Sequence, residues 1–475
     1  MKRTCFRSVA VISCSFVLAL VADAATRPRK GGTLRVLVGA QPKSLDPRKP
    51  PAEPREQAAA EKLVRLMYDR LVALDENGQP QPQLATGWQH DAAFKRWTFE
   101  IRTGVNFWDN TPLTPEIVAA ALQSVPGSPP ARAIGGSVII EGQSPNPEML
   151  RDLAQAQFSI YRVAENGAVL GTGSFYLSEW QPGKRAVLAA NEKDWRGRPF
   201  VDAVEVEMGV AQREQIVALE LGRADLIEVG PTDVRRVTQG THRVWLSLPN
   251  ELLAIVFQPG RPAAQDARVR EALARSIDRA AIHAVLLQKQ GEPAGGLLPQ
   301  WLSGYEFLFS TAQDLPRANE IAASLPPELR SLTLGYESTD SLAKAIAERI
   351  AVNARDAGLA LQAIEQPSAP AGGVAPIAVD AILSRLRIDD ADAGRALAAI
   401  VTGSLVTDWK HPLSPVPPEV LYGEERNLVD SHQIIPLFHL PEIYALSARV
   451  KNWNPARTGK LRLEEIWLEG LAEKP

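Results

Sequence analysis

The stretch LATGWQHDAAFKRWTFEIRTGVNFWDNTPLTPEIVAAAL, Leu84–Leu122, decides the fold. Within Trp97–Ile101 hydrophobic side chains alternate with polar ones, a pattern that predicts a half-buried strand. Thr114 can cap a helix whose first residue is Pro115, a position where proline costs no hydrogen bond. The residues therefore predict a strand, two turns and a helix in close succession.

Length and composition indicate a globular chain of more than one domain. The chain has 475 residues, of which 45% are hydrophobic and 23% charged. A chain of this length exceeds a single hydrophobic core, so we expect two or three domains. The net charge of -3 gives no reason to expect nucleic acid as a partner.

Residues 1–24 have the features of a secretory signal peptide. A basic start precedes the apolar run Val9–Ala22, and Ala-Asp-Ala at 22–24 fits a small-x-small cleavage site. The run is shorter than the roughly 20 residues of a membrane-spanning helix. We therefore expect cleavage and a periplasmic or otherwise extracytoplasmic location. Both cysteines, Cys5 and Cys14, lie in this segment, and a lipid anchor at Cys14 is not expected because the apolar run continues beyond it.

Several motifs, in order, resemble the family 5 extracellular solute-binding proteins. LATGW at 84–88 is followed by W-x-F-x-I-R-x-G-V-x-F and D-x-x-P-L-T-x-x-x-V, and later come GTGSF at 171–175, DARVREALARSIDR at 266–279 and IPLF at 435–438. Those proteins are oligopeptide-, dipeptide- and nickel-binding receptors of ABC importers. Together the motifs cover most of residues 31–460.

The resemblance implies an α/β fold of the periplasmic-binding-protein type, with two lobes, two crossing strands and an extra subdomain. It implies lobe I from 25–50, 171–250 and 433–475, a trimmed subdomain II from 51–170, and lobe III from 251–432. Leu252–Phe257 is the apolar strand expected to cross between the lobes. Asp266–Ile282 is expected as one helix whose arginines face solvent, because acidic residues are interspersed with them.

We find no catalytic or cofactor motif and expect neither an enzyme nor a resident metal. The sequence has no H-E-x-x-H, G-x-S-x-G or phosphate-binding loop. The six histidines are scattered, and His432 and His439 are the nearest pair. No cofactor is expected.

The resemblance also suggests where a ligand would bind. In peptide-binding members an aspartate in a W-x-x-D context pairs with the α-ammonium group of the ligand, and Asp389 stands at that position. This chain lacks the tryptophan and proline of that motif. One acid of the cluster formed by Asp389, Asp390 and Asp392 could instead cap the helix predicted over Gly394–Ile400. The ligand-binding candidates are Gln41, Ser44, Gln258, Asp389, Asp390 and Trp409.

The function implied is a monomeric receptor that captures a peptide or peptide-like solute between its lobes and delivers it to an ABC permease. Two alternatives stay open. One is a receptor for another solute, such as a nickel chelate or an oligosaccharide. The other is a degenerate member that acts as a sensor or structural partner.

Overall fold

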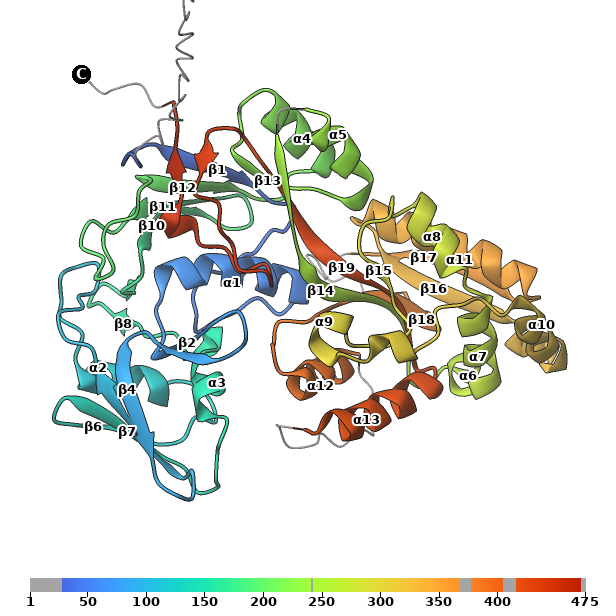
Figure 1. Ribbon diagram of the computed structural model, residues 1–475, viewed down its shortest axis with the longest axis horizontal. Helices are drawn as coiled ribbons and strands as arrows, with labels where there is room; N and C mark the ends of the chain where they lie inside the picture. Colours follow the sequence, from blue (N-terminus) through green and yellow to red (C-terminus); the bar gives the residue numbers. More distant parts are fainter. Residues whose placement is uncertain (1–27, 241, 368–376, 405–415, 471–475) are drawn as a thin grey trace, which may run out of the picture.

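A mixed sheet runs through two of the three parts of the molecule, and the third part has a smaller sheet of its own (Figure 1). The structure is a computed structural model that describes residues 28–240, 242–367, 377–404 and 416–470. The strand order among these residues is β10-β11-β12-β1-β13-β19-β14-β18-β16-β17, with β15 paired to β19. Helices pack along this sheet, so the predicted α/β class is confirmed.

One half of the sheet forms the core of what we call lobe I. Its parallel strands β1, β12 and β13 and the antiparallel strands β10 and β11 enclose buried residues such as Leu34, Phe175 and Val204. Helix α1 packs into the same core through Leu63 and Met67. The elements of lobe I are β1 (Thr33–Leu37), α1 (Pro54–Met67), β10 (Phe175–Gln181), β11 (Arg185–Ala190), β12 (Ala203–Glu207), α4 (Gln212–Glu220), β13 (Leu226–Glu228), α5 (Val234–Thr238), β20 (Val450–Lys451) and β21 (Trp467–Leu468).

Two long antiparallel strands continue from lobe I into the other half of the sheet. β14 (Arg243–Phe257) pairs with β19 (Ile434–Leu446) along nearly its whole length. At one end β19 pairs with β13 of lobe I, and at the other end β14 pairs with β18. Both strands therefore belong to both halves, and Figure 1 shows them as the bridge between the two.

The other half of the sheet, with its helices, is called lobe III here. Its core contains apolar residues of β14, β16 and β18 together with α7 and α11. A second cluster packs α12 and α13 on the opposite face. The elements of lobe III are α6 (Pro262–Gln265), α7 (Ala267–Ser276), α8 (Arg279–Val285), β15 (Glu292–Pro293), α9 (Gln300–Ser303), α10 (Leu315–Ser324), β16 (Ser331–Glu337), α11 (Ser341–Asp356), β17 (Ala360–Gln366), β18 (Ala381–Arg387), α12 (Ala393–Gly403) and α13 (Pro418–Asp430).

The stretch Leu84–Leu122 lies in a smaller unit, subdomain II, with a separate four-stranded sheet of order β4-β5-β7-β6. Trp97, Phe99 and Ile101 of β5 are buried in its core, as the alternation predicts. The hydroxyl oxygen of Thr114 caps α2 by accepting the N–H of Ile117. The elements of subdomain II are β2 (Val72–Leu74), β3 (Pro80–Pro82), β4 (Ala85–His90), β5 (Arg96–Ile101), α2 (Pro115–Gln123), β6 (Ala131–Ile134), β7 (Ser137–Glu141), α3 (Met149–Leu153), β8 (Arg162–Val163) and β9 (Val169–Leu170).

The single helix expected over Asp266–Ile282 is wrong, because the structure has two. α7 ends at Ser276, and the carboxylate of Asp278 then caps α8 by accepting the N–H of Ala281. Two of the arginines that were expected to face solvent are buried. Arg270 donates to the carbonyl oxygens of Ala264, Gln265 and Ser431, and Arg279 donates to that of Pro436. Charge patterning along the sequence could not predict these backbone partners.

Within the described residues, no helix is both long and apolar enough to span a membrane. The predicted signal peptide lies outside those residues.

Candidate functional site

Four charged side chains form a chain of ion pairs where α1, the crossing strand β19 and the end of β18 meet. Lys62 Nζ lies 2.9 Å from Glu442 Oε1, and Arg387 Nη1 lies 3.0 Å from the same oxygen. Arg387 also binds both carboxylate oxygens of Asp389 at 2.6–3.0 Å. We call Lys62, Glu442, Arg387 and Asp389 the charge network.

The local structure explains why these groups meet. Strand pairing sets Arg387 opposite Glu251 of β14, and Glu251 opposite Leu440, two residues before Glu442 on β19. The hydroxyl group of Tyr444, next along the same face of β19, lies 2.6 Å from Lys62 Nζ and 3.0 Å from Glu442 Oε2. Because side chains alternate along a strand, Glu442 and Tyr444 point toward the same helix.

The electrostatics of the charge network keep every member ionised. Burial opposes a charge at both Lys62 and Glu442. Tyr444 and then Glu442 nevertheless raise the pKa of Lys62, and Lys62 and then Arg387 lower the pKa of Glu442. The crowded surroundings of Asp389 also oppose its charge, but the Arg387 guanidinium lowers its pKa. The side chain of Asp389 remains 57% exposed, so this ion pair dominates over burial.

Further ion pairs join the other parts of the molecule to lobe III. Arg395 Nη1 of α12 lies 3.1 Å from Asp152 Oδ1 of α3, and Arg151 Nη1 lies 3.7 Å from Asp390 Oδ1. Subdomain II also touches lobe III at Gly78, whose φ is +71°. A Cβ atom at Gly78 would lie only 2.8 Å from that of Ala391. Subdomain II and lobe III are therefore in direct contact in the described structure.

The structure gives the three acids of the predicted cluster separate partners. Asp389 pairs with Arg387, and Asp390 Oδ2 accepts from Arg395 Nε at 2.8 Å. Asp392 caps α12 by accepting the N–H of Arg395 at 2.9 Å, which is the helix-capping role expected for one of the acids. Only Asp389 of the three belongs to the charge network.

The remaining candidates lie apart from the charge network. Gln41 lies against the backbone of Gly209, a positive-φ glycine of lobe I, where a Cβ atom would come within 2.2 Å of Gln41 Nε2. Ser44 lies in the same loop and lines a cavity between lobe I and subdomain II. Gln258 follows the far end of β14, seven residues or roughly 23 Å beyond Glu251. Trp409 lies outside the described residues.

Sequence reasoning missed Lys62, Arg387, Glu442 and Tyr444. One signal was present, because Glu442 is the single acid in the largely apolar strand β19. A charge in a buried strand requires a partner, and this rule could have directed attention to Glu442. The partner itself could not be found from sequence, since Lys62 is 380 residues away.

The described residues include no group of three or more His, Cys, Asp or Glu side chains arranged to hold a metal ion. His439 is fully buried, with its Nε2 3.1 Å from the carbonyl oxygen of Leu297. Burial lowers the pKa of His439 to about 4.

Two lobes joined by crossing strands, with a polar interface between them, define the class of two-lobed binding proteins. The family model for bacterial extracellular solute-binding proteins, family 5 middle region, matches residues 79–404. The chain belongs to this family, which confirms the resemblance drawn from the motifs.

Individual relatives are distant. The probable D,D-dipeptide-binding periplasmic protein DdpA of Escherichia coli is 23% identical over 273 residues, covering 50% of this chain and 52% of DdpA. The chain thus spans about half the length of this curated relative, and 23% to 27% of four others.

The similarity to solved structures extends over nearly the whole chain. A dipeptide-binding protein from Pseudoalteromonas in complex with Met-Leu has a TM-score of 0.77 at 15% identity, covering 92% of this chain and all of that one. NikA from Staphylococcus aureus in complex with Ni(L-His)2 has a TM-score of 0.75 at 17% identity, covering 92% and 100%. At these identities the likeness establishes the shared fold.

Proposed function

We propose that this protein is the extracytoplasmic receptor of an ABC importer, and that it captures a peptide or peptide-like solute between lobes I and III and delivers it to a membrane permease. The observation that carries the proposal is the position of the charge network. It lies beside both crossing strands, where lobe I and lobe III meet, and rotation of one lobe against the other would open this place to a solute.

The relatives support a peptide-like solute. DdpA is named as a probable D,D-dipeptide-binding protein, and the Pseudoalteromonas neighbour was solved with Met-Leu. A receptor of this kind can bind the backbone of a peptide as an added strand, which tolerates many side chains. We propose Asp389 as a ligand-binding residue, and Lys62, Arg387 and Tyr444 as its neighbours in the same site.

We further propose the domain division expected from sequence, with lobe I from 25–50, 171–250 and 433–475, subdomain II from 51–170 and lobe III from 251–432. One feature refines it. Helix α1, residues 54–67, packs with lobe I, and the separate core of subdomain II begins at Leu71. We also propose that residues 1–24 are removed as a signal peptide and that the receptor is a monomer.

The pairing of Asp389 favours a second candidate. Arg387 already occupies the carboxylate of Asp389 with a bidentate contact, so a ligand ammonium group would have to displace a guanidinium. A solute without a free amino group, such as a blocked peptide or a metal chelate, would avoid that cost. NikA, a structural neighbour, was solved with Ni(L-His)2.

The test is mass spectrometry of small molecules released from the purified protein by denaturation, followed by isothermal titration of what is found. The proposal expects short peptides, with binding weakened by Asp389→Asn. Released metal chelates or blocked peptides, with binding indifferent to Asp389→Asn, would favour the second candidate. An empty protein that binds no peptide, sugar or chelate would contradict a transport role.

A further inference from the structure

A cavity lies away from the charge network, between lobe I and subdomain II. It has a volume of about 940 Å³ and is bordered by the loop after β1, by β10 and by the loops at 108–110 and 190–193. None of the described residues that line it belongs to lobe III. Closure of lobe III is therefore not needed to form it, and we call it the aromatic cavity.

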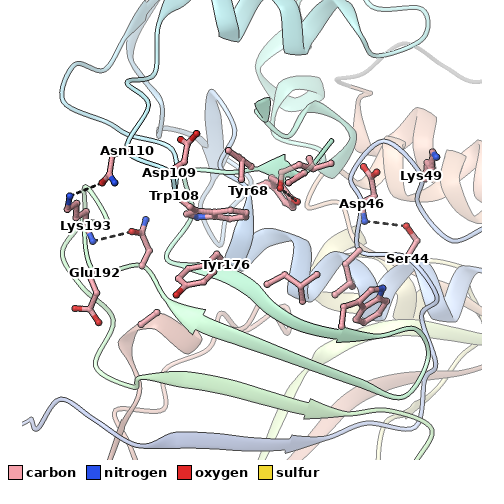
Figure 2. A pocket seen from close by; sticks show the side chains of 18 of the residues that line it. Ser44, Asp46, Lys49, Tyr68, Trp108, Asp109, Asn110, Tyr176, Glu192 and Lys193 are labelled. Carbon is pink, nitrogen blue, oxygen red and sulfur yellow. Dashed lines mark hydrogen bonds between the residues drawn. The ribbon is translucent and has the colours of Figure 1, made fainter. Parts of the chain in front are cut away.

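Three aromatic rings form one side of the aromatic cavity. The ring centroid of Trp108 lies 5.5 Å from that of Tyr68 and 6.2 Å from that of Tyr176. Tyr68 is buried, whereas Tyr176 is 38% exposed. Figure 2 shows Trp108 and Tyr176 in the middle of the cavity. Exposed aromatic faces of this kind offer a stacking surface to a planar ring.

The rings are fixed in place by the backbone behind them. Trp108 Nε1 donates to the carbonyl oxygen of Gly173 at 3.2 Å. At Gly171 a Cβ atom would lie 2.8 Å from Tyr68 Cδ1 and 2.9 Å from Trp108 Cζ2, so only glycine allows this approach. The aromatic surface is thus preorganised, which reduces the entropic cost of binding.

The charges around the cavity do not cancel. Each lining acid has an arginine partner: Asp46 pairs with Arg48, Asp109 with Arg162, and Glu192 with Arg198. The lining lysines have no such match, since among the described residues none of Lys43, Lys49 and Lys193 has a carboxylate within 4 Å. Lys193 Nζ instead lies 2.8 Å from the amide oxygen of Asn110. The lining itself holds three acids and three lysines, so its positive character comes from the arginines behind it, which pair with the acids and leave the lysines without a carboxylate partner.

We propose that the aromatic cavity binds a small planar aromatic carboxylate, a ligand class distinct from the solute of the lobe interface. Its ring would stack on Tyr176 and Trp108, and its carboxylate would meet Lys193. Asn110 and Lys193 lie together at one end of the Trp108 ring (Figure 2). The Asn110 amide can donate a hydrogen bond from its Nδ2 while its oxygen holds Lys193. Ring stacking and a charged hydrogen bond at one end would set both the class and the orientation of the ligand.

The test is isothermal titration of the purified protein with 2-naphthoate, 2-naphthamide and 2-naphthylmethylammonium. These probes share the ring and differ in charge. We expect 2-naphthoate to bind about tenfold or more tightly than the other two. Lys193→Gln should weaken naphthoate binding about tenfold and leave the amide unchanged, whereas Tyr176→Leu should weaken both.

Two controls separate this proposal from the proposed importer function. Lys344→Gln, an exposed lysine on α11, should leave naphthoate binding unchanged. Asp389→Asn should also leave it unchanged, even if solute binding at the lobe interface is lost. The proposal is overturned if the amide binds as tightly as the carboxylate. It is also overturned if Lys193→Gln and Lys344→Gln weaken naphthoate binding equally. A third contrary result would be a protein that does not bind naphthoate but binds an oligosaccharide or a proline-rich peptide, with that binding abolished by Tyr176→Leu.

Discussion

The charge network at the lobe interface and the aromatic cavity use charge in opposite ways. In the network each cation has an acid at hydrogen-bond distance, from Lys62 through Glu442 and Arg387 to Asp389. Around the cavity the acids are neutralised by arginines, and the lysines remain. A ligand at the network must therefore replace a contact within the protein, whereas a ligand in the cavity can add one. Binding at the network should therefore cost a broken ion pair, whereas binding in the cavity should not.

The largest expected effect follows from removing the acid at the centre of the network. Glu442→Gln keeps the shape of the side chain but leaves Lys62 and Arg387 without their shared counter-charge. Their side chains are only 23% and 28% exposed, so we expect a loss of about 3 kcal/mol in stability. Denaturant unfolding followed by tryptophan fluorescence measures it.

The matched control is Glu220→Gln. Glu220 pairs with Arg236 on the surface, with side chains 42% and 50% exposed, and such pairs contribute about 0.5 kcal/mol. Equal losses in the two variants would mean that the network is no stronger than a surface ion pair, and the contrast with the aromatic cavity would weaken.

The next effect concerns competition for Asp389. Arg387→Met removes the guanidinium that holds this carboxylate and leaves Asp389 free for a ligand ammonium group. If the importer proposal is correct, trialanine should bind about tenfold more tightly, because one charged hydrogen bond no longer has to be displaced. N-acetylated trialanine should show no gain, and isothermal titration distinguishes the two.

Arg349→Met, on the exposed face of α11, is the control for loss of an arginine alone. An equal gain for both peptides would show that Arg387 acts by filling space and not by pairing with Asp389. The Arg387–Asp389 ion pair would then have no influence on which ligand binds.

The sequence predicts the fold better than the site for a physical reason. Period-two burial in β5, the Thr114 cap and a helix cap by one acid of the 389–392 cluster are local, and all three predictions agree with the structure. The charge network depends on pairing between Lys62 and Glu442, which only the folded chain brings together. Local pattern likewise could not show that α1 packs in the core of lobe I, while the core of subdomain II begins after it, at Leu71.

The aromatic cavity shows the same limit. Its aromatic side comes from three separate segments of the chain, at Tyr68, Trp108 and Tyr176. In the sequence, none of the three has a neighbouring residue that indicates a binding site. Ser44, a ligand-binding candidate from the sequence, lies in the loop after β1 and lines this cavity, apart from the charge network.

A third effect concerns Lys460, a partly buried lysine whose neighbours include several arginines. Burial, together with Arg65, Arg70 and Arg462, lowers the pKa of Lys460 to about 7. The unfolded chain, with a lysine pKa near 10.4, therefore binds more protons than the folded one between pH 7 and about 10.4. Stability should rise with pH through this window, because proton loss costs less in the folded state.

Lys460→Met should remove this rise. Since Lys460 is partly exposed, we expect a difference of about 1 kcal/mol between pH 7 and pH 9, measured by denaturant unfolding at both values. Lys344→Met, at an exposed position, should keep the pH dependence of the parent protein. Parent protein and Lys460→Met with the same change in stability between pH 7 and pH 9 would contradict a lowered pKa of Lys460 in the folded state.

The smallest effect concerns the ion pairs that hold subdomain II against lobe III. Arg395 and Asp152 are 3.1 Å apart, with side chains 19% and 32% exposed, so their contribution is about 1 kcal/mol or less. Asp152→Asn should shift the ligand-free protein slightly toward an open arrangement, seen as a larger radius of gyration in small-angle X-ray scattering. In 1 M salt the parent protein should expand similarly, because screening weakens the same pair. Glu320→Gln, which removes an exposed pair within α10, should leave the radius unchanged at either salt concentration. If Asp152→Asn leaves the radius of gyration unchanged, the Arg395–Asp152 pair does not hold subdomain II against lobe III, and the Arg151–Asp390 contact and the packing of Gly78 on Ala391 are the contacts that do.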